Sequence, residues 1–291
     1  MATVAQWVAG ARPRTLPAAI APVAAGTGVA AAEDGLVAGR ALLALAVALC
    51  LQIGVNYAND YSDGIRGTDD ARVGPVRLVG QGLAAPAAVK RAALGSLALA
   101  AVLGLLLVVL AEAWLWLLVG ALSIAAAWLY TGGPRPYGYA GLGEVSVFTF
   151  FGPVAVIGTS YVQTDAITGL AVAASVPIGV LASLILIANN LRDIPTDIES
   201  GKRTLAVRLG DRGTRDLFTA GAVAAFAVVA LIVPFQPGAL AGLAGSVPMA
   251  GAVRDVRSGA LGRSLIPVLG RTSMALLLTG VGLGLGLGLL G

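Results

Sequence analysis

Residues 41–63 read ALLALAVALCLQIGVNYANDYSD, a long apolar run that ends in polar residues. A continuous apolar run of this kind is typical of a helix that crosses a membrane. Asn56, Asp60 and Asp63 close the run at positions i, i+4 and i+7, so in a helix they share one face. The stretch therefore predicts a transmembrane helix that carries one amide and two carboxylates together near one end.

The composition of the whole chain agrees with a membrane protein. Of its 291 residues 57% are hydrophobic and only 12% are charged, whereas soluble domains carry about 25% charged residues. The chain has no histidine, which excludes histidine-held haem, histidine-based zinc sites and Ser-His-Asp triads. Its one cysteine, Cys50, excludes a disulfide within the chain. We expect an all-α, polytopic membrane protein.

Counting apolar runs long enough to cross a bilayer predicts about nine transmembrane helices, and eight is an alternative because several links are short. The nine ranges are about 15–32, 41–60, 87–111, 113–131, 144–162, 167–190, 214–233, 236–253 and 268–290.

The C-terminal stretch GVGLGLGLGLLG has glycines four residues apart on two helix faces. We expect these glycines to allow close packing of this helix against its neighbours.

The basic residues predict the orientation of these helices. With the N-terminus inside, 18 of the 19 Lys and Arg residues fall on the inner side, and only Arg40 lies outside. Cytoplasmic loops are enriched in Lys and Arg, so we expect an inner (plasma) membrane protein with a cytoplasmic N-terminus and an external C-terminus. The net charge of +4 is then an orientation signal rather than a sign of nucleic-acid binding.

A second polar cluster matches the first. Asn189, Asp193 and Asp197 follow another apolar run at positions i, i+4 and i+8. The clusters are 133 residues apart, and each ends the second helix of a four-helix stretch. We therefore expect one domain over 1–291, with internal repeats at about 15–131 and 144–253 and a final helix at 268–290.

The two clusters predict a metal site that takes a phosphorylated ligand. Four carboxylates on one side of the membrane repel one another unless cations neutralise them. Oxygen ligands without His or Cys suit Mg²⁺ or a similar hard cation, which phosphate oxygens commonly complete. The alternative, solvated helix ends, explains less well why the two clusters match in face and side. The residues proposed as catalytic metal ligands are Asp60, Asp63, Asp193 and Asp197.

Basic loops follow both clusters. Their charges fit the orientation rule, but Arg135 stands alone in the Gly/Pro-rich loop YTGGPRPYGYAGLGE, where a guanidinium suits phosphate bidentately. We expect Arg135 to contact the ligand. The basic residues near the clusters are Arg66, Arg72, Arg77, Arg192, Lys202, Arg203 and Arg208.

Over nearly its whole length the chain resembles the UbiA superfamily of intramembrane prenyltransferases. The stretches that carry the resemblance are RPRTLPAAIAPV, NYANDYSDGIRGTDD, GPVRLVGQG, YTGGPRPYGYAGLGE, NNLRDIPTD and GKRTLAVRLG. The resemblance implies a UbiA-type helical bundle in which the four Asp residues hold Mg²⁺, or Mn²⁺, on an allylic diphosphate. It also implies the substrate-binding residues Asn56, Arg77, Tyr130, Arg135, Tyr137, Tyr139, Asn189 and Lys202.

Within the superfamily, the first stretch and the tyrosine-rich loop resemble the branch that transfers a polyprenyl group to 1,4-dihydroxy-2-naphthoate in menaquinone biosynthesis. Two departures from the family pattern matter. Lys is frequent where this chain has Arg135, and Asp69 or Asp70 could replace or join Asp63 as a metal ligand. Another aromatic acceptor such as 4-hydroxybenzoate stays an alternative. A transporter is a weaker one, because transporter sites lie near the midplane.

Overall fold

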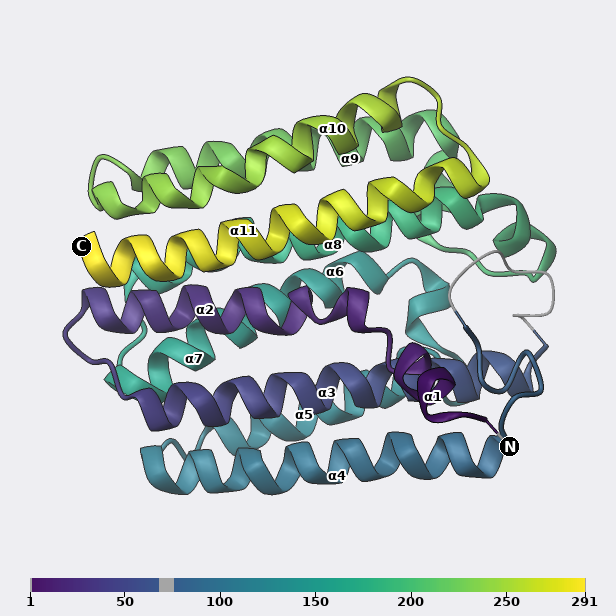
Figure 1. Ribbon diagram of the computed structural model, residues 1–291, viewed down its shortest axis with the longest axis horizontal. Coiled ribbons are helices and arrows are strands. Elements are labelled where there is room, and N and C mark those ends of the chain that lie inside the picture. The colour runs from purple at the N-terminus through teal and green to yellow at the C-terminus, as the bar shows by residue number, and fades with distance from the viewer. Residues whose placement is uncertain (1, 68–75, 291) are drawn as a thin grey trace.

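The computed structural model describes residues 2–67 and 76–290, and within them every regular element is helical. Figure 1 shows the long helices lying side by side along one axis. Asp69, Asp70 and Arg72 lie outside the described residues. The elements are α1 Val4–Gly10, η1 Pro13–Thr15, α2 Pro17–Ala32, α3 Ala38–Ile65, α4 Pro86–Ala111, α5 Trp116–Leu129, η2 Tyr137–Ala140, α6 Gly143–Thr149, η3 Phe150–Val154, α7 Ala155–Thr164, α8 Gly169–Glu199, α9 Leu205–Ile232, η4 Pro237–Gly245, α10 Ser246–Arg257, η5 Gly262–Leu265 and α11 Ile266–Leu290.

In the described part of the chain, six helical segments are long and apolar enough to cross a membrane. The bent pair Val4–Thr15 and Pro17–Ala32 is a seventh candidate. Each of the nine predicted ranges coincides with helical structure, although 144–162 is divided into α6, η3 and α7, and 236–253 into η4 and α10. The protein is therefore an all-helical, multi-pass membrane protein.

Two helices extend further than the apolar runs suggested. Helix α3 continues to Ile65, and α8 continues through Pro195 to Glu199. A proline removes one backbone donor, but so close to the end of α8 this does not stop the helix. Asp63 and Asp197 are consequently helical residues with fixed directions, rather than parts of mobile loops.

The glycines of the C-terminal helix pack against neighbouring backbones, as expected. A Cβ atom built on Gly284 of α11 would lie 2.6 Å from the backbone oxygen of Ala24 in α2, which is too close for any side chain. On the other face, a Cβ on Gly282 would lie 2.3 Å from the backbone oxygen of Ala241 in η4. Small residues thus let α11 approach both neighbours without a gap.

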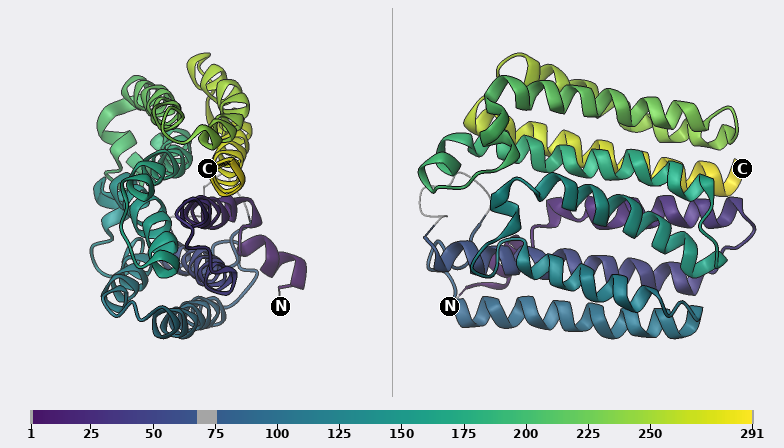
Figure 2. Two further views of the ribbon diagram at one scale, coloured as in Figure 1. Left: turned by 90° about the vertical axis from the view of Figure 1, so that its left-hand side faces the viewer. Right: turned by 180° about the vertical axis from the view of Figure 1, so that it is seen from behind.

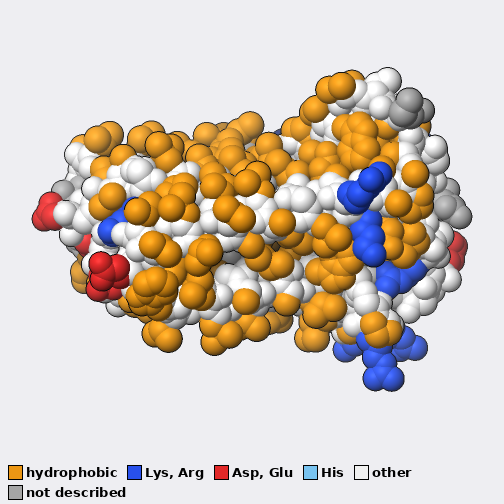
Figure 3. Space-filling view, turned by 90° about the horizontal axis from the view of Figure 1, so that it is seen from below, with side chains coloured by type: hydrophobic (Ala, Val, Ile, Leu, Met, Phe, Trp, Pro, Cys, Tyr) orange, Lys and Arg blue, Asp and Glu red, His pale blue; other side chains and the backbone are white. Residues whose placement is uncertain are grey.

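Basic residues gather at one end of the molecule, and the other end is mainly acidic. The links between α2 and α3, α4 and α5, and α7 and α8 lie at one end and carry acidic residues (Figures 1 and 2). Figure 3 shows a hydrophobic middle, most of the visible basic side chains at one end, and acidic side chains at both ends. Arg40 is the exception, because its guanidinium donates to the backbone oxygens of Val162 and Leu110 at the acidic end. Both Asp motifs also lie at the basic end, because they stand in the last turns of α3 and α8.

Candidate functional site

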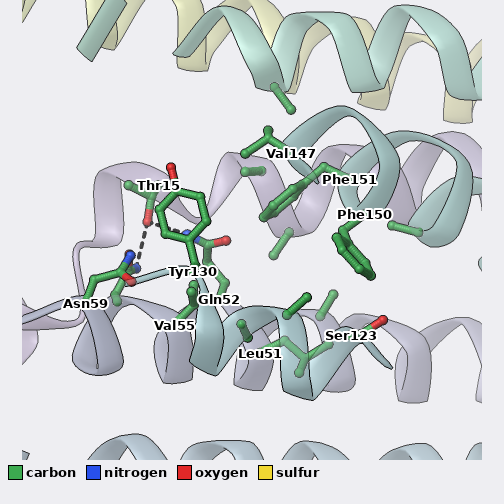
Figure 4. Close-up of a pocket in the computed structure, with 18 of the residues that line it drawn as sticks. Thr15, Leu51, Gln52, Val55, Asn59, Ser123, Tyr130, Val147, Phe150 and Phe151 are labelled. Carbon is green, nitrogen blue, oxygen red and sulfur yellow. Dashed lines mark hydrogen bonds between the residues drawn. The ribbon is translucent and has the colours of Figure 1, made fainter. Parts of the chain in front are cut away.

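A cavity of about 1300 Å³ runs between the helices, with walls from α1 to α8 and from the start of α11. Its basic end is polar and the rest is mostly apolar. In Figure 4, Thr15, Gln52, Asn59 and Tyr130 gather at one end, while Val147, Phe150 and Phe151 line the deeper part. The polar lining residues include Arg12, Arg14, Asn56, Asn59, Asp63, Arg77, Tyr130, Tyr137, Tyr139, Asn189, Asn190, Arg192, Asp197 and Lys202.

Nine of the twelve predicted site residues line this cavity. The three that do not are Asp60, Asp193 and Arg135. The structure thus brings residues from both Asp motifs and from the tyrosine-rich loop to one place, although they come from distant parts of the sequence. The nine are Asn56, Asp63, Arg77, Tyr130, Tyr137, Tyr139, Asn189, Asp197 and Lys202.

In the first motif the two carboxylates have different surroundings. Asp60 is buried, and its oxygens accept hydrogen bonds from the backbone N–H groups of Leu78 (2.7 Å) and Val79 (3.0 Å). Asp63 lines the cavity and accepts a hydrogen bond from the hydroxyl of Tyr139. Asp60 therefore fastens the segment that follows residue 75 to α3, which places the neighbouring Arg77 in the cavity wall.

The second motif has the same division. Asp193 accepts two hydrogen bonds from Arg192, at 2.7 and 2.8 Å, and Arg192 also donates to the amide oxygen of Asn189 at 2.7 Å. Asp197 lines the cavity, and the hydroxyl of Thr204 lies 3.4 Å from its Oδ2. In each motif, then, one carboxylate lines the cavity and accepts a hydrogen bond from a protein hydroxyl, while the other is bonded to N–H donors outside the cavity lining.

Lys202 joins the two motifs at the polar end. Its Nζ lies 4.0 Å from Oδ1 of Asp63 and 4.4 Å from the centre of the Tyr139 ring. The backbone N–H of Lys202 donates to the carbonyl oxygen of Asp197 at 2.8 Å. The ammonium group is nearly buried, so its attraction for an anion is weakened less by water than that of a surface charge.

The tyrosine-rich loop turns its aromatic residues inward. Tyr130 and Tyr137 make an edge-to-face contact at 5.5 Å, and the Tyr137 hydroxyl donates to the backbone oxygen of Ala126 at 2.8 Å. Burial raises the pKa of Tyr137, so this group stays a neutral phenol. Arg135, at the tip of the same loop, is exposed and outside the cavity. In this structure the loop presents its tyrosines to the cavity and its arginine to the surroundings, and a contact of Arg135 with the ligand stays a prediction.

The N-terminal segment adds residues that the two clusters did not predict. Arg12 and Arg14 line the cavity, and Arg12 has a φ of 55°. The amide nitrogen of Asn56 donates to the backbone oxygen of Ala11 and to the hydroxyl of Thr15, both at 2.9 Å. Asn56 therefore holds this segment over the cavity. The available signal was the pair of arginines in the stretch RPRT.

The donors at the polar end fit a hard cation that the protein binds through few ligands. Among the described residues no three carboxylates gather closely enough to form a complete metal site. Asp63 and Asp197, however, each present one carboxylate to the cavity. Mg²⁺ commonly binds one or two carboxylates and completes its shell with water and substrate phosphate. Of the four carboxylates that we expect to hold a metal, Asp63 and Asp197 line the cavity and Asp60 and Asp193 lie beside it.

The model of the UbiA prenyltransferase family matches residues 19–263, which is most of the chain. The chain belongs to this family. The resemblance drawn from the sequence motifs is thereby confirmed, and the protein is a membrane-embedded prenyltransferase.

Two curated relatives of this family member match nearly its full length, and a third matches more than two thirds of it. It is 57% identical over 277 residues to 1,4-dihydroxy-2-naphthoate octaprenyltransferase of Mycobacterium tuberculosis, covering 95% of this chain and 94% of the relative. The Mycobacterium leprae protein of the same name is 52% identical, covering 97% and 95%. The protein so named in Escherichia coli is 42% identical over 215 residues, covering 72% and 70%.

Solved structures share the fold at much lower identity. A UbiA homologue from Archaeoglobus fulgidus bound to GPP and Mg²⁺ superimposes with a TM-score of 0.67 at 13% identity, covering 95% of this chain and 99% of that one. The apo structure of a UbiA homologue from Aeropyrum pernix gives 0.63 at 18% identity, covering 92% and 96%. These likenesses establish the UbiA-type helical bundle.

Proposed function

We propose that this prenyltransferase transfers a polyprenyl group from polyprenyl diphosphate to 1,4-dihydroxy-2-naphthoate, with release of diphosphate and CO₂, in menaquinone biosynthesis. The observation that carries the proposal is one cavity with a polar end built from both Asp motifs and an apolar remainder. The two mycobacterial relatives, which match over nearly the whole chain, support this choice of acceptor.

The polar end suits the diphosphate of the donor. Lys202 and Arg77 supply buried cations, and Asp63 and Asp197 would hold Mg²⁺, or Mn²⁺, against the phosphate oxygens. The metal would neutralise negative charge on the leaving diphosphate. Lys202 stabilises the same charge as the C–O bond breaks, and it needs no rearrangement because its interactions with Asp63 and Tyr139 already fix its place.

The apolar part of the cavity suits the isoprenoid chain. Val147, Phe150 and Phe151 line it below the polar end (Figure 4). An allylic cation must not meet water, and apolar walls within a membrane exclude it. The cavity also reaches Gly104 of α4 and Gly120 of α5, where a Cβ atom would meet nothing within 4 Å. We infer that a long chain leaves between α4 and α5 toward lipid.

The protein lacks a histidine base, and the acceptor ring is itself a good nucleophile. The protein has no histidine that could act as a general base. In 1,4-dihydroxy-2-naphthoate the hydroxyls push electrons into the ring, so the ring carbon that bears the carboxylate can attack with little help. The new C–C bond forms as the donor's C–O bond breaks, and loss of the carboxylate as CO₂ restores aromaticity. The direct product is the quinol form of demethylmenaquinone, so the step needs no oxidant and no protein base.

We also propose how the protein sits in the membrane. Counting α5 and the η4–α10 segment as spans gives nine crossings in a single domain with two repeats. The basic end of the molecule, with the active-site loops, faces the cytoplasm of an inner (plasma) membrane. The positive-inside rule supports this orientation, because the acidic end carries only Arg40 among the described basic residues.

A single experiment tests the reaction. Purified protein is incubated with Mg²⁺, a polyprenyl diphosphate and a panel of aromatic acids, and the products are identified by mass. We expect a prenylated product that has lost CO₂ from 1,4-dihydroxy-2-naphthoate only, and no product in excess EDTA. Efficient prenylation of 4-hydroxybenzoate with its carboxylate kept would favour the other acceptor class. Turnover without any membrane gradient separates the enzyme from a transporter.

A further inference from the structure

A carboxylate outside both Asp motifs is buried beside the cavity. Glu144, in the first turn of α6, is only 7% exposed. Its Oε1 accepts a hydrogen bond from the amide nitrogen of Asn190 in α8 at 2.9 Å. In the part of the chain that the structure describes, its Oε2 has no hydrogen-bond partner. Buried polar atoms without a hydrogen-bond partner are uncommon, so the burial of this carboxylate needs a functional explanation.

Glu144 fixes the direction of the Asn190 amide. The NH₂ group of Asn190 faces Glu144 and donates to its Oε1, so the side-chain carbonyl oxygen of Asn190 points away from Glu144. Asn190 also lines the cavity, and no residue within 2–67 or 76–290 donates to its carbonyl oxygen. Asn189 differs, because its carbonyl oxygen accepts from Arg192. The Asn190 carbonyl is therefore an acceptor left for a ligand.

The position of the Asn190 carbonyl oxygen along the cavity suits a hydrogen bond to the aromatic substrate. Asn190 precedes Asp197 by seven residues of α8, which is about 10 Å along a helix axis. It thus lies about two turns of α8 from Asp197, toward the apolar part of the cavity. Tyr130 lines the same region, and its hydroxyl lies 3.1 Å from where a Cβ on Gly143 would be.

We propose that Asn190 accepts a hydrogen bond from a ring hydroxyl of the aromatic acceptor, and that Glu144 is the positioning residue that orients the amide for it. The inference deepens the proposed function and rests on it, since the acceptor must carry a phenolic hydroxyl. Glu144 does not line the cavity and belongs to no described group of three metal-binding side chains, so it acts through Asn190 rather than on the diphosphate.

The test measures binding rather than turnover. Inhibition constants are determined for 2-naphthoate, 1-hydroxy-2-naphthoate and 4-hydroxy-2-naphthoate as competitors of the natural acceptor. In the unaltered protein we expect one of the two hydroxynaphthoates to bind about tenfold more tightly than 2-naphthoate, as one hydrogen bond to a polar group allows. This difference in inhibition constant is the gain from the hydroxyl group. In Asn190→Ala and in Glu144→Gln this gain should disappear, while the donor KM stays the same.

The double variant and a matched control complete the test. Because Glu144 acts through Asn190, the double variant should lose no more of the gain than Asn190→Ala alone. The control is Ser183→Ala, since the Ser183 hydroxyl lies 3.1 Å from the backbone oxygen of Glu144 and links the same two helices. This control should keep the gain.

Three results would overturn the inference: no hydroxyl gain in the unaltered protein, an undiminished gain in Glu144→Gln, or an equal loss in Ser183→Ala. If Glu144→Gln does not fold, the arms with Asn190→Ala and Ser183→Ala still decide whether a hydroxyl binds Asn190. Failure of the proposed function appears separately, as the absence of a decarboxylated prenyl product.

Discussion

Nζ of Lys202 lies 4.0 Å from Oδ1 of Asp63, and this contact connects the segment after α8 to the end of α3. The two residues are 139 positions apart in the sequence, yet both are nearly buried at the polar end of the cavity. A carboxylate and an ammonium group held side by side suit a ligand that combines a metal ion with an anion.

Replacing Lys202 by Met should weaken donor binding or its turnover. The change keeps an unbranched side chain but removes the cation, and the loss of one hydrogen bond to a charged group reduces kcat/KM by about 10–100-fold. Steady-state kinetics at varied donor concentration measure kcat/KM for the donor. Lys90→Met is the matched control, because Lys90 is the other lysine of the chain and does not line the cavity. Equal losses in both variants would contradict a role in donor binding.

Asp63→Asn and Asp197→Asn should each raise the Mg²⁺ concentration needed for activity. An amide binds a divalent cation less well than a carboxylate, and the loss should exceed the roughly 10–100-fold typical of residues that only support ligands. The measurement is a Mg²⁺ titration of activity, with Mn²⁺ binding followed by electron paramagnetic resonance. Asp255→Asn, in an ion pair with Arg271 away from the cavity, should leave the titration unchanged. Full activity in excess EDTA would rule out the metal.

Arg77→Ala should raise the donor KM more than Arg135→Ala. Arg77 is only 7% exposed and lines the cavity, whereas Arg135 is exposed and lies outside it. A buried charge interacts more strongly with an anion than one in water. Steady-state kinetics on both variants, with the acceptor saturating, give the comparison. A larger effect at Arg135 would instead support the contact that the sequence predicted.

Gly104→Phe should shorten the isoprenoid that the enzyme accepts. Gly104 lines the cavity and has open space around a Cβ, so the new ring enters the cavity without disturbing the packing. Activity with a long donor should fall about 10–100-fold, the effect of overfilling a site by 1–3 kcal/mol, while a short donor is used as before. Gly95→Phe is the control, because Gly95 also has open space on α4 but does not line the cavity. Equal effects on both donors would contradict the exit between α4 and α5.

Single cysteines should report the orientation of the helices. In a Cys50→Ser background, Asp34→Cys and Glu112→Cys should react with an impermeant thiol reagent in intact cells. Arg135→Cys and Ser258→Cys should react only after the membrane is opened. The first two positions lie at the acidic end and the last two at the basic end. Labelling of Ser258→Cys in intact cells would mean that the orientation or the number of spans is different.

The sequence by itself determined the class of protein and most of the candidate site. Apolar runs of membrane length predicted helices, since helices satisfy their own backbone hydrogen bonds in lipid. The spacing of Asp60 and Asp63, and of Asp193 and Asp197, predicted the polar end because side chains three or four residues apart share a helix face. The glycines of α11 were expected to pack closely, and they do.

Only the tertiary structure decided which carboxylate of each motif faces the cavity. Asp60 and Asp193 accept hydrogen bonds from Leu78 and Arg192 and do not line the cavity, whereas Asp63 and Asp197 do line it. Helical spacing cannot distinguish them, because the choice depends on segments that pack against the helix from elsewhere. The same reason applies to Glu144: its pairing with Asn190 spans 46 residues, and a pair at such a distance forms only when two helices meet.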